Sequence, residues 1–517
     1  MNSLTPLLRS RVHSWLLPLL MIGSLVPIWS TTYFPSQNGP WHLLTVKMLH
    51  DYTNPAFNYA EFYVPSFHAI PHLVHTLLVY LLAFVFPLLV AHKIVISLYA
   101  LLFPVSVFWF LATVNPKRVA AGYVTFLFIY SVPLLRGYHD YALGIPLVFL
   151  TLTYWLRHRD RMTVFSSALV MLLIVCVYLS HVFNFMVLGL AMVVFAVHQR
   201  RSLRPVYQIA ILLLPAALLL AEYTVYNVQH AVWLNKSELM YLAPHVAVNS
   251  FFERFFSAFS ATAYYLAVTP LLLGIPMLSR SLKKAYRRSG QVWYRVAFYS
   301  PALTLFLLLT LLYLVTPFKL LGWHYVNVRF VPYVIIFALA SLNASGRLER
   351  RAVVMTISIA ALGIFYINTV HFQRTGRMLE EYLSALPKMR PNSVLLPLAF
   401  DGSQVGRMSP LAHAYDYYHI YRGGANGKGI AKFNTVTPMV YRTYPVTRVF
   451  PRWESYRPAR MHRVVQTYDY VLIWGGDLNT TVFLQQAGFK VVHEQGQLRF
   501  FENRRGRLEV EALMRHE

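Results

Sequence analysis

The sequence predicts an α-helical polytopic membrane protein that ends in a soluble α/β domain. Of its 517 residues, 57% are hydrophobic and only 13% are charged, whereas soluble proteins average about 25% charged residues. The mean hydropathy is +0.46. Polar side chains cannot cover the surface of such a chain, so lipid must cover part of it. After His371 charged residues become common and apolar runs shorten to strand length, which predicts a separate soluble part.

The net charge of +26 suggests nucleic-acid binding at first sight, but the positions of the basic residues argue against it. They cluster between the apolar runs, as in cytoplasmic loops under the positive-inside rule. The clusters are Arg9 and Arg11, Lys117 and Arg118, Arg157 to Arg161, Arg200 to Arg204, Lys283 to Arg288, and Arg347 to Arg351. The single cysteine, Cys176, lies in an apolar run and excludes an internal disulfide or a thiolate metal cluster.

We predict about eleven membrane spans, with the N-terminus in the cytoplasm and the C-terminus outside, from apolar runs long enough to cross a bilayer. A further apolar helix near 69–89 is interpreted as lying on the outer surface, because counting it as a span would put two basic clusters outside. The spans are 14–33, 91–113, 119–135, 139–156, 163–180, 183–198, 205–226, 259–279, 296–316, 327–343 and 352–370. The outer loops are then 34–90, 136–139, 180–183, 227–258 and 317–326.

We therefore predict a transmembrane domain over 1–370 and an extracytoplasmic α/β domain over 371–517. The second segment is long enough to bury a core of its own. Its predicted elements are a helix at 379–386, buried strands at 393–398 and 470–474, a helix end with a glycine stop at 484–488, and a strand pair at 491–493 and 498–502 around Gly496.

The first outer loop, 34–90, holds the first candidate site residues: Asn38, His42, Asp51 and Glu61. Group transfer to a hydroxyl needs a base, and a carboxylate just outside the membrane suits that role. Asn38 cannot be a base at neutral pH, but its carbonyl oxygen can bind a hydroxyl or a divalent cation. The alternative is that Asn38 is a turn residue before Gly39 and that the two acids have no role in chemistry.

The tight outer turn at 136–141 holds the second group of candidates: Arg136, His139 and Asp140. Charged residues at a membrane boundary are costly unless satisfied, so they indicate function. Asp140 can act as a base or metal ligand, and Arg136 can bind phosphate. The alternative is an ion pair between Arg136 and Asp140 that holds the turn.

Two later segments complete the candidates. His181 lies in the next outer turn and can line the same cavity, although a lone histidine is more often a hydrogen-bonded structural residue. Arg329 stands at the top of a late span, near Lys319 and His324, and can bind a phosphate. The alternative for Arg329 is an arginine that extends to the membrane interface.

No strong catalytic motif is present in the sequence: it has no Walker loop, and no GxGxxG, HExxH or CxxC pattern with supporting context. The glycine-rich run at 423–429 lacks the strand-to-helix setting of a phosphate loop and is interpreted as a flexible loop.

The stretch at 35–43, PSQNGPWHL, resembles the Q-D-G-P-x-H-L start of bacterial membrane proteins in the C-type glycosyltransferase superfamily. The outer helix with His72, the turn at 136–141 and the strand at 469–475 fit the same layout. The resemblance implies eleven spans, a large first outer loop with a surface helix, and an extracytoplasmic C-terminal domain.

The resemblance also implies an inverting transfer of a sugar from a polyprenyl phosphate on the outer face. The family's first-loop aspartate falls on Asn38, its second acidic residue on Asp140, and its phosphate-binding basic residue on Arg329. Asparagine at position 38 departs from the family pattern. Either Asp140 or Asp51 then supplies the carboxylate, or activity is lost and a binding role remains.

The leading hypothesis is therefore a glycosyltransferase of the bacterial inner membrane that moves a sugar to an envelope glycan, lipid or protein. Its expected partners are the polyprenyl-phosphate sugar, the bilayer and envelope-assembly proteins, and the one cofactor suggested is a divalent cation. The alternatives are a non-catalytic scaffold for polysaccharide assembly and a transporter. Transporters usually show inverted repeats and broken helices at mid-membrane, whereas here no repeat is visible and the ionisable residues lie at the outer boundaries.

Overall fold

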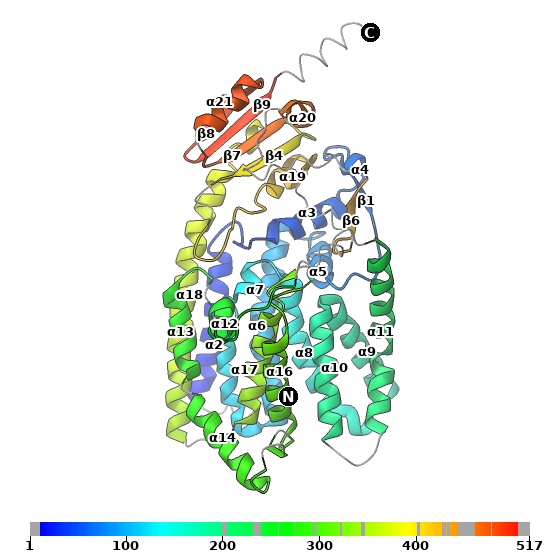
Figure 1. Cartoon of the computed structure of the whole chain (residues 1–517), viewed down its shortest axis with the longest axis vertical. Helices are drawn as coiled ribbons and strands as arrows, with labels where there is room; N and C mark the ends of the chain where they lie inside the picture. The colour runs from blue at the N-terminus through cyan, green and yellow to red at the C-terminus, as the bar shows by residue number, and fades with distance from the viewer. Residues whose placement is uncertain are drawn as a thin grey trace. The chain divides into compact units, whose positions relative to one another are not determined.

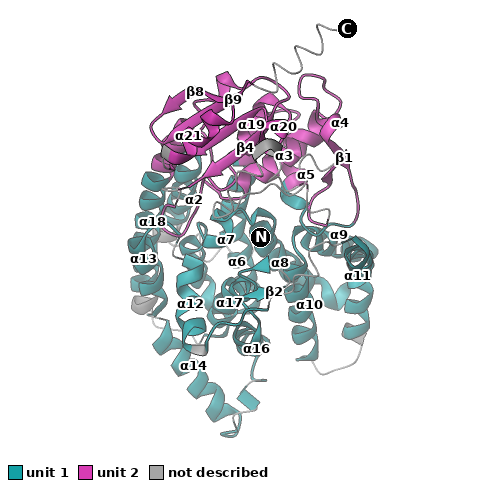
Figure 2. Cartoon of the chain, turned by 45° about the horizontal axis from the view of Figure 1, so that its top comes forward, with its two compact units in different colours: residues 1–30, 69–75, 93–371 teal, residues 31–68, 76–92, 372–517 magenta. Residues whose placement is uncertain are grey.

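The chain folds into two compact units, each built from segments distant in sequence (Figure 2). Unit 1 comprises Met1–Ser30, Ala69–His75 and Lys93–His371, and unit 2 comprises Thr31–His68, Thr76–His92 and Phe372–Glu517. The computed structural model describes residues 11–198, 204–230, 239–256, 258–272, 274–292, 295–296, 298–320, 323–342, 347–400, 404–426, 431, 435–442, 461–476 and 478–504. Of the glycine-rich run at 423–429, interpreted as a flexible loop, residues 427–429 lie outside the described residues.

Unit 1 is helical except for one short antiparallel strand pair among its described residues (Figure 1). Helices α5, α6 and α18 run from one unit into the other, and the first two residues of α5 belong to unit 1. The elements are α2 (Arg11–Trp29), α6 (Leu88–Val114), η1 (Pro116–Leu127), α7 (Val132–Leu135), α8 (His139–His158), η2 (Arg159–Arg161), α9 (Val164–Ser180), α10 (Val182–Val197), α11 (Arg204–His230), α12 (Pro244–Phe256), α13 (Ala261–Leu272), α14 (Ile275–Arg288), α16 (Pro301–Val315), β2 (Lys319–Leu320), β3 (Trp323–His324), η4 (Asn327–Phe330), α17 (Val331–Ser341) and α18 (Arg347–Tyr382).

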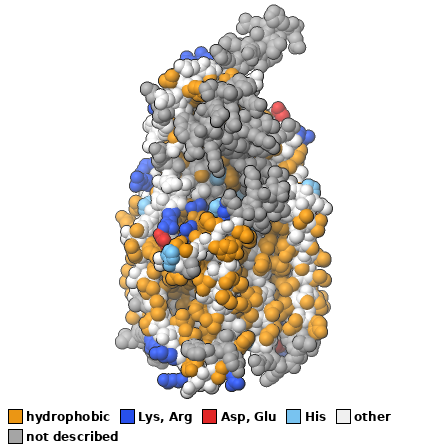
Figure 3. Space-filling model, viewed as in Figure 1, with side chains coloured by type: hydrophobic (Ala, Val, Ile, Leu, Met, Phe, Trp, Pro, Cys, Tyr) orange, Lys and Arg blue, Asp and Glu red, His pale blue; other side chains and the backbone are white. Residues whose placement is uncertain are grey.

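The helices of unit 1 confirm the predicted class of multi-pass membrane protein. Five described helical stretches are long and apolar enough to cross a bilayer: 88–114, 116–135, 206–230, 261–288 and 351–388. Helix α11 exposes Ile211, Leu214 and Leu218, and hydrophobic side chains cover much of the helical surface (Figure 3). An apolar surface of this extent needs lipid to cover it.

One predicted span, 119–135, differs in kind from a regular α-helix. Residues 116–127 form the 3₁₀ helix η1, and α-helical geometry returns only in α7. Gly122 permits this path, because a Cβ there would lie 2.6 Å from a ring carbon of Phe108. Pro133 lies in the first turn of α7, where its missing N–H removes no helical hydrogen bond.

Three further boundaries differ from the sequence prediction. The predicted outer loop 227–258 contains helix α12. The predicted span 259–279 falls on two helices, α13 and α14, with Gly274 as the N-cap of α14 and Pro276 in its first turn, where a proline removes no helical hydrogen bond. The predicted surface helix over 69–89 is helical only over α5 (Val74–Leu82) before α6 begins.

One end of the unit 1 bundle holds a polar cavity of about 620 Å³. It is lined by residues at the ends of α6, α8, α10, α16 and α17, among them Asn115, Arg159, His198, Ser300 and Ser341. Each of these helix ends adjoins a segment that the sequence analysis predicted to be cytoplasmic. Helix α8 has 20 residues, so its other end lies about 30 Å away.

Unit 2 contains a five-stranded mixed sheet in the order β5-β4-β7-β9-β8, in which β9 and β8 are antiparallel to their neighbours. The predicted strand at 470–474 coincides with β7, and Gly496 closes the predicted final pair with φ of 55°. The elements are α3 (Gly39–His50), α4 (Tyr59–Phe62), β1 (Tyr63–Pro65), α5 (Val74–Leu82), η5 (Leu386–Lys388), β4 (Val394–Ala399), α19 (Asp416–Arg422), β5 (Ala425–Asn426), β6 (Met439–Tyr441), α20 (Met461–Thr467), β7 (Tyr470–Trp474), α21 (Leu478–Gln486), β8 (Phe489–Gln495) and β9 (Leu498–Asn503). The helix predicted at 379–386 is the end of α18 followed by η5.

The first loop and the C-terminal segment pack together within unit 2. Strand β1 pairs antiparallel with β6, and the Tyr59 hydroxyl donates to the carbonyl of His419 at 2.7 Å. The rings of Trp41 and His413 lie 3.6 Å apart, centroid to centroid. The domain limits near residue 370 stay a prediction.

The stability of unit 2 is expected to fall in acid because of His419. Burial lowers the pKa of this side chain to about 4, although Nδ1 donates to the carbonyl of Gly423. The unfolded chain, with an ordinary pKa near 6.5, therefore binds the proton more tightly than the folded chain below that pH, and stability is lost between pH 6.5 and 4. We expect the titration of His419 to lower the free energy of unfolding by about 2 kcal/mol at pH 5 relative to pH 7. Thermal unfolding in detergent at the two pH values measures this.

The control for this prediction is His419→Asn, which keeps a donor near the Nδ1 position but does not titrate. Its melting temperature should fall less between pH 7 and pH 5 than that of the wild type. An equal fall in both proteins would show that acid acts elsewhere.

Candidate functional site

The predicted site residues divide between the two units. Arg136, His139, Asp140, His181 and Arg329 belong to unit 1, whereas Asn38, His42, Asp51 and Glu61 belong to unit 2. Those of unit 1 come from the turn before α8, the start of α8, the junction of α9 with α10, and η4. Each group is described within its own unit.

The start of α8 buries a carboxylate. Gly137, with φ of 84°, turns the chain between α7 and α8, and Asp140 in the first helical turn is 3% exposed. Its Oδ1 accepts a hydrogen bond from the backbone N–H of His75 at 2.7 Å, whereas its Oδ2 has no hydrogen-bond partner in the described part of the chain. The carboxylate therefore caps α5 with one oxygen and keeps the other available.

The alternative role proposed for Arg136 and Asp140, an ion pair that holds the turn, does not occur in the described structure. The guanidinium of Arg136 instead lies over the ring of Tyr325, 4.4 Å from its centroid. Arg136 and Asp140 thus have different partners. Arg136 contacts an aromatic ring, and Asp140 accepts a hydrogen bond at the start of α5.

Arg329 is the second buried charge of this region and is 6% exposed. Its guanidinium lies 5.5 Å from the ring centroid of Tyr138 and 5.9 Å from that of Tyr141. Its Nε has no hydrogen-bond partner, and it forms no salt bridge to an acid among the described residues. The Tyr141 hydroxyl donates to the carbonyl of Arg329 at 2.8 Å and so positions η4.

His181 lies beside Arg329 and is neutral. Burial, followed by the charges of Arg329 and His72, lowers the pKa of His181 well below its ordinary value. Its Nδ1 accepts the backbone N–H of Phe183 at 3.0 Å and caps α10, so the proton of the neutral ring is on Nε2, which can donate. The His72 ring lies 4.6 Å from His181 and 5.9 Å from Trp323.

Both arginines act on one aromatic residue, Tyr138. Burial raises the pKa of the Tyr138 hydroxyl, and the positive charges of Arg329 and Arg136 oppose that rise. Arg136 and Arg329 therefore form a cationic cluster lined by aromatic rings, and the neutral His181 lies beside it. Such an arrangement favours an anion, and a guanidinium matches the oxygens of a phosphate.

A buried amide joins the helices that carry this cluster. Asn184 of α10 donates from Nδ2 to the carbonyl of Tyr141 on α8 at 2.9 Å, and its Oδ1 accepts the hydroxyl of Tyr333 on α17 at 2.8 Å. Gly144 makes room for Asn184, since a Cβ there would lie 1.7 Å from the Asn184 Nδ2.

The acidic candidates of unit 2 have local partners. Asp51 ends α3, and its carboxylate lies 2.8 Å from Lys47 Nζ and accepts from Asn54. Burial acts to raise the pKa of Asp51, but the Lys47 and Asn54 hydrogen bonds outweigh it and hold the pKa below its ordinary value. Glu61 is exposed and accepts from Asn58. These local partners explain the positions of Asp51 and Glu61 without a catalytic role.

Asn38 and His42 lie at the start of α3 and are half-buried. Asn38 is the N-cap residue, yet its side chain makes no capping hydrogen bond, so its amide is not committed to holding the helix. Its backbone carbonyl accepts from the N–H of Trp41. The predicted roles of Asn38 and His42 stay predictions.

The sequence argument did not include three residues that complete the unit 1 cluster: His75, Tyr138 and Tyr325. His75 is the second residue of α5 and contacts Asp140 through its backbone N–H, which no side-chain pattern reveals. Tyr138 lies in the turn at 136–141 between the candidates Arg136 and His139. This position in the sequence could have indicated that Tyr138 belongs to the site. Tyr325 has a positive φ of 61°, which only the folded chain shows.

The apolar helices and the small mixed sheet of the C-terminal segment match the fold of solved membrane-protein structures. One solved protein of similar fold is ArnT from Cupriavidus metallidurans. Its apo crystal structure shares 13% identity and a TM-score of 0.57, and the match covers 96% of this chain and 98% of ArnT. The structure of ArnT bound to undecaprenyl phosphate matches at 12% identity and a TM-score of 0.53, with the same coverage.

The likeness at this level of identity establishes the fold. No protein-family model matches the sequence, and no curated protein matches it. The predicted fold class is confirmed, and the activity is a proposal that rests on the site.

The position of the cationic cluster should depend on Gly144. Replacing it with alanine places a methyl group against Asn184 Nδ2 and Ser180 Oγ, so the helices must separate or the amide must lose its partners. We expect a loss of at least about 2 kcal/mol in unfolding free energy, measured as a lower melting temperature in detergent.

Gly189→Ala on α10 is the matched control. Its new Cβ would meet only a methyl carbon of Leu213 at 3.7 Å, an ordinary contact, and alanine favours a helix over glycine. This variant should be as stable as the wild type or more stable. Equal effects of the two substitutions would contradict the role assigned to Asn184.

Proposed function

We propose that this protein is a membrane glycosyltransferase that moves a sugar from a polyprenyl phosphate to a hydroxyl group of an envelope acceptor. The observation that carries the proposal is Arg329, a guanidinium 6% exposed and without an acidic partner in the described structure. A buried charge without a counter-charge costs several kcal/mol. A bound anion removes that cost.

The chemistry around Arg329 favours a phosphate as that anion. Arg136 and Arg329 act on the same tyrosine, and the neutral His181 has Nε2–H to donate. The rings of Tyr138, Tyr141 and Trp323 supply apolar and stacking surface beside the charges. A phosphate that carries both a sugar and a hydrocarbon chain matches this combination of cations and aromatic rings.

Asp140 is proposed to be the base. The acceptor oxygen attacks the anomeric carbon of the sugar while the bond from that carbon to the phosphate oxygen breaks. The hydroxyl proton passes to the free Oδ2 of Asp140, and the polyprenyl phosphate leaves with its negative charge stabilised by Arg329 and Arg136. Attack on the face opposite the leaving group inverts the anomeric centre.

The comparison with ArnT supports this proposal, because a protein of the same fold has been solved with undecaprenyl phosphate bound. The proposed location is a bacterial inner membrane, with the N-terminus in the cytoplasm and the cationic cluster on the outer side. Arg159, which lines the polar cavity at the other end of unit 1, supports this orientation.

Asn38 favours one second candidate function, that of a non-catalytic scaffold in polysaccharide assembly. A transferase with asparagine at the family's first carboxylate position must obtain its base elsewhere. The buried Asp140, with one oxygen unpartnered among the described residues, favours the enzyme.

Binding of polyprenyl phosphate should require Arg329. Arg329→Gln removes the charge at similar size, and loss of charged hydrogen bonds of this kind weakens affinity about 10- to 100-fold. The affinity of the purified protein in lipid nanodiscs for undecaprenyl phosphate is measured by titration.

Arg159→Gln is the control for binding, because Arg159 also lies over an aromatic ring, that of Trp155 at 5.3 Å, but at the other end of α8. Its affinity should equal that of the wild type. Undiminished binding by Arg329→Gln would remove the main support for a phosphate site.

Transfer activity should require Asp140. With a panel of radiolabelled polyprenyl-phosphate hexoses and pentoses and a mixed acceptor extract, Asp140→Asn should lower the initial rate about 100- to 10,000-fold, the range for loss of a general base. Asn38→Asp should retain activity. Asp160→Asn, at the opposite end of α8, is the matched control and should not alter the rate.

The other outcomes separate the alternatives. Activity in Asn38→Asp with none in the wild type would identify a disabled transferase kept for binding. No transfer by any variant, with the donors validated on an active transferase, would favour the scaffold.

A further inference from the structure

Helix α14 carries a row of basic side chains on one face. They recur at intervals of three and four residues, which places them along one side of the helix. The row consists of Arg280, Lys283, Lys284, Arg287 and Arg288. All five side chains are exposed, and the helix contains no acidic residue. Figure 3 shows Lys and Arg side chains at the end of unit 1 where Figure 1 draws α14.

The opposite face of α14 packs against the protein. Ala285 is buried in a small apolar cluster with Val296 and with Leu303 of α16, and Leu282 and Tyr286 pack against that cluster. This packing fixes the rotation of α14 about its own axis. The basic row therefore points away from the protein.

Helix α14 lies at the end of unit 1 that holds the polar cavity. Arg288 donates from Nη1 to the hydroxyl of Tyr299 at 3.1 Å, and Tyr299 lines that cavity. With α13, the helix belongs to an apolar stretch of 28 residues, 261–288. About 20 residues suffice to cross the hydrocarbon of a bilayer. The last turns of α14 therefore extend to the level of the lipid headgroups.

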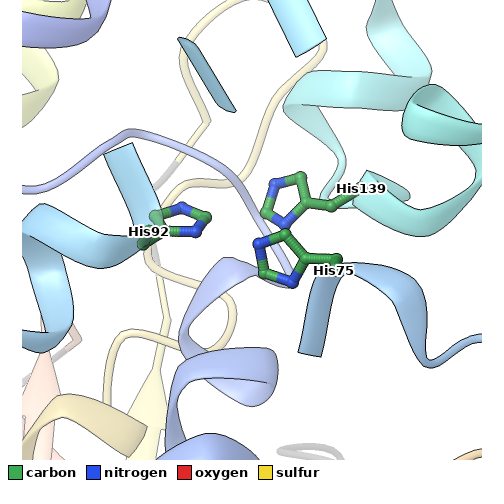
Figure 4. Close-up of side chains that lie close together, drawn as sticks. All are labelled: His75, His92 and His139. Carbon is green, nitrogen blue, oxygen red and sulfur yellow. The ribbon is translucent and has the colours of Figure 1, made fainter. Parts of the chain in front are cut away.

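The exposure of the basic row contrasts with the ionisable groups at the start of α8, about 30 Å away. There the rings of His75 and His139 are fully buried, and Figure 4 shows them against each other. A buried pair can be reached only by a small ligand, whereas an exposed row of cations can contact an extended surface. The row on α14 thus favours a partner that is both extended and negatively charged.

Mutual repulsion within the row also favours such a partner. Like charges four residues apart destabilise a helix, and the row contains three such pairs: 280 with 284, 283 with 287, and 284 with 288. Lys283, Lys284 and Arg287 form no salt bridge with any residue that the structure describes. Negative charge beside the row would offset the repulsion.

An apolar cavity at the start of α14 indicates what kind of anion fits. It has a volume of about 70 Å³ and lies between α14, α13, α17, α18 and η1. Met277 lines it, on the same face of α14 as Arg280 and Lys284, and the exposed Lys117 lines it from η1. Apolar cavities take hydrocarbon in preference to water. Space for hydrocarbon followed by cations is the order of tail and headgroup in a phospholipid.

We propose that the basic face of α14 binds an anionic phospholipid of the cytoplasmic leaflet. The lipid phosphate contacts the basic row, because a guanidinium matches phosphate oxygens and an anionic leaflet attracts basic residues beside a span. One acyl chain lies against the cavity at Met277. The bound lipid offsets the repulsion along α14 and fixes the depth of this helix in the bilayer. The proposal does not rest on the proposed transferase, because lipid binding is measured without sugar transfer.

The test is the affinity of the full-length protein in detergent micelles for dioleoylphosphatidylglycerol, measured by native mass spectrometry. Dioleoylphosphatidylcholine, which has no net charge, is the reference lipid and should bind more weakly. The triple variant Lys283→Gln/Lys284→Gln/Arg287→Gln should bind the anionic lipid about 100-fold more weakly than the wild type, since each cation near an anionic surface contributes about fivefold. Its affinity for the reference lipid should not change. Higher salt should weaken the wild-type affinity for the anionic lipid.

The matched control is Lys283→Arg/Lys284→Arg/Arg287→Lys, which keeps all three charges and should bind the anionic lipid as the wild type does. Glutamine, lysine and arginine favour a helix about equally, and melting temperatures identify any variant that fails to fold. Equal affinity of the wild type and the folded glutamine variant for the anionic lipid would overturn the proposal. Glycerol 3-phosphate that binds as tightly as the lipid would instead assign the row to a soluble phosphate, and an oligonucleotide that displaces the lipid would assign it to nucleic acid.

Discussion

The hydrogen bonds of one buried amide, Asn184, determine where the candidate site lies in unit 1. The amide joins α10 to α8 through the carbonyl of Tyr141 and to α17 through the hydroxyl of Tyr333. Tyr141 in turn holds the carbonyl of Arg329. In a bilayer no water can replace a lost partner, so each of these bonds strongly disfavours separation of the helices. The positions of Arg329 and Asp140 follow from this network.

The site that results contains charges whose desolvation the described protein does not offset. Arg329 has aromatic neighbours but no acid, and Asp140 keeps one oxygen without a partner. Proteins normally pair such groups, and the exceptions mark places where a ligand completes the site. A phosphate at the arginines would satisfy the charge of Arg329.

The contrast with Asp51 and Glu61 shows how partners separate functional from structural acids. Asp51 is neutralised by Lys47 within one helical turn, and Glu61 meets solvent and Asn58. Asn38 has a side chain that does not cap its helix, so its amide is not committed to holding α3. The base that we propose is Asp140.

The sequence by itself determined the membrane class, most of the helices, the C-terminal strands and the candidates Arg136, His139, Asp140, His181 and Arg329. Hydrophobic length, charge bias and turn residues are local properties, so they can be read along the chain. Only the tertiary structure decided that residues 116–127 form a 3₁₀ helix, that α12 lies in a predicted loop, and that His75 joins Asp140. These features depend on contacts between residues distant in sequence, such as Gly122 with Phe108, and no local pattern encodes such contacts.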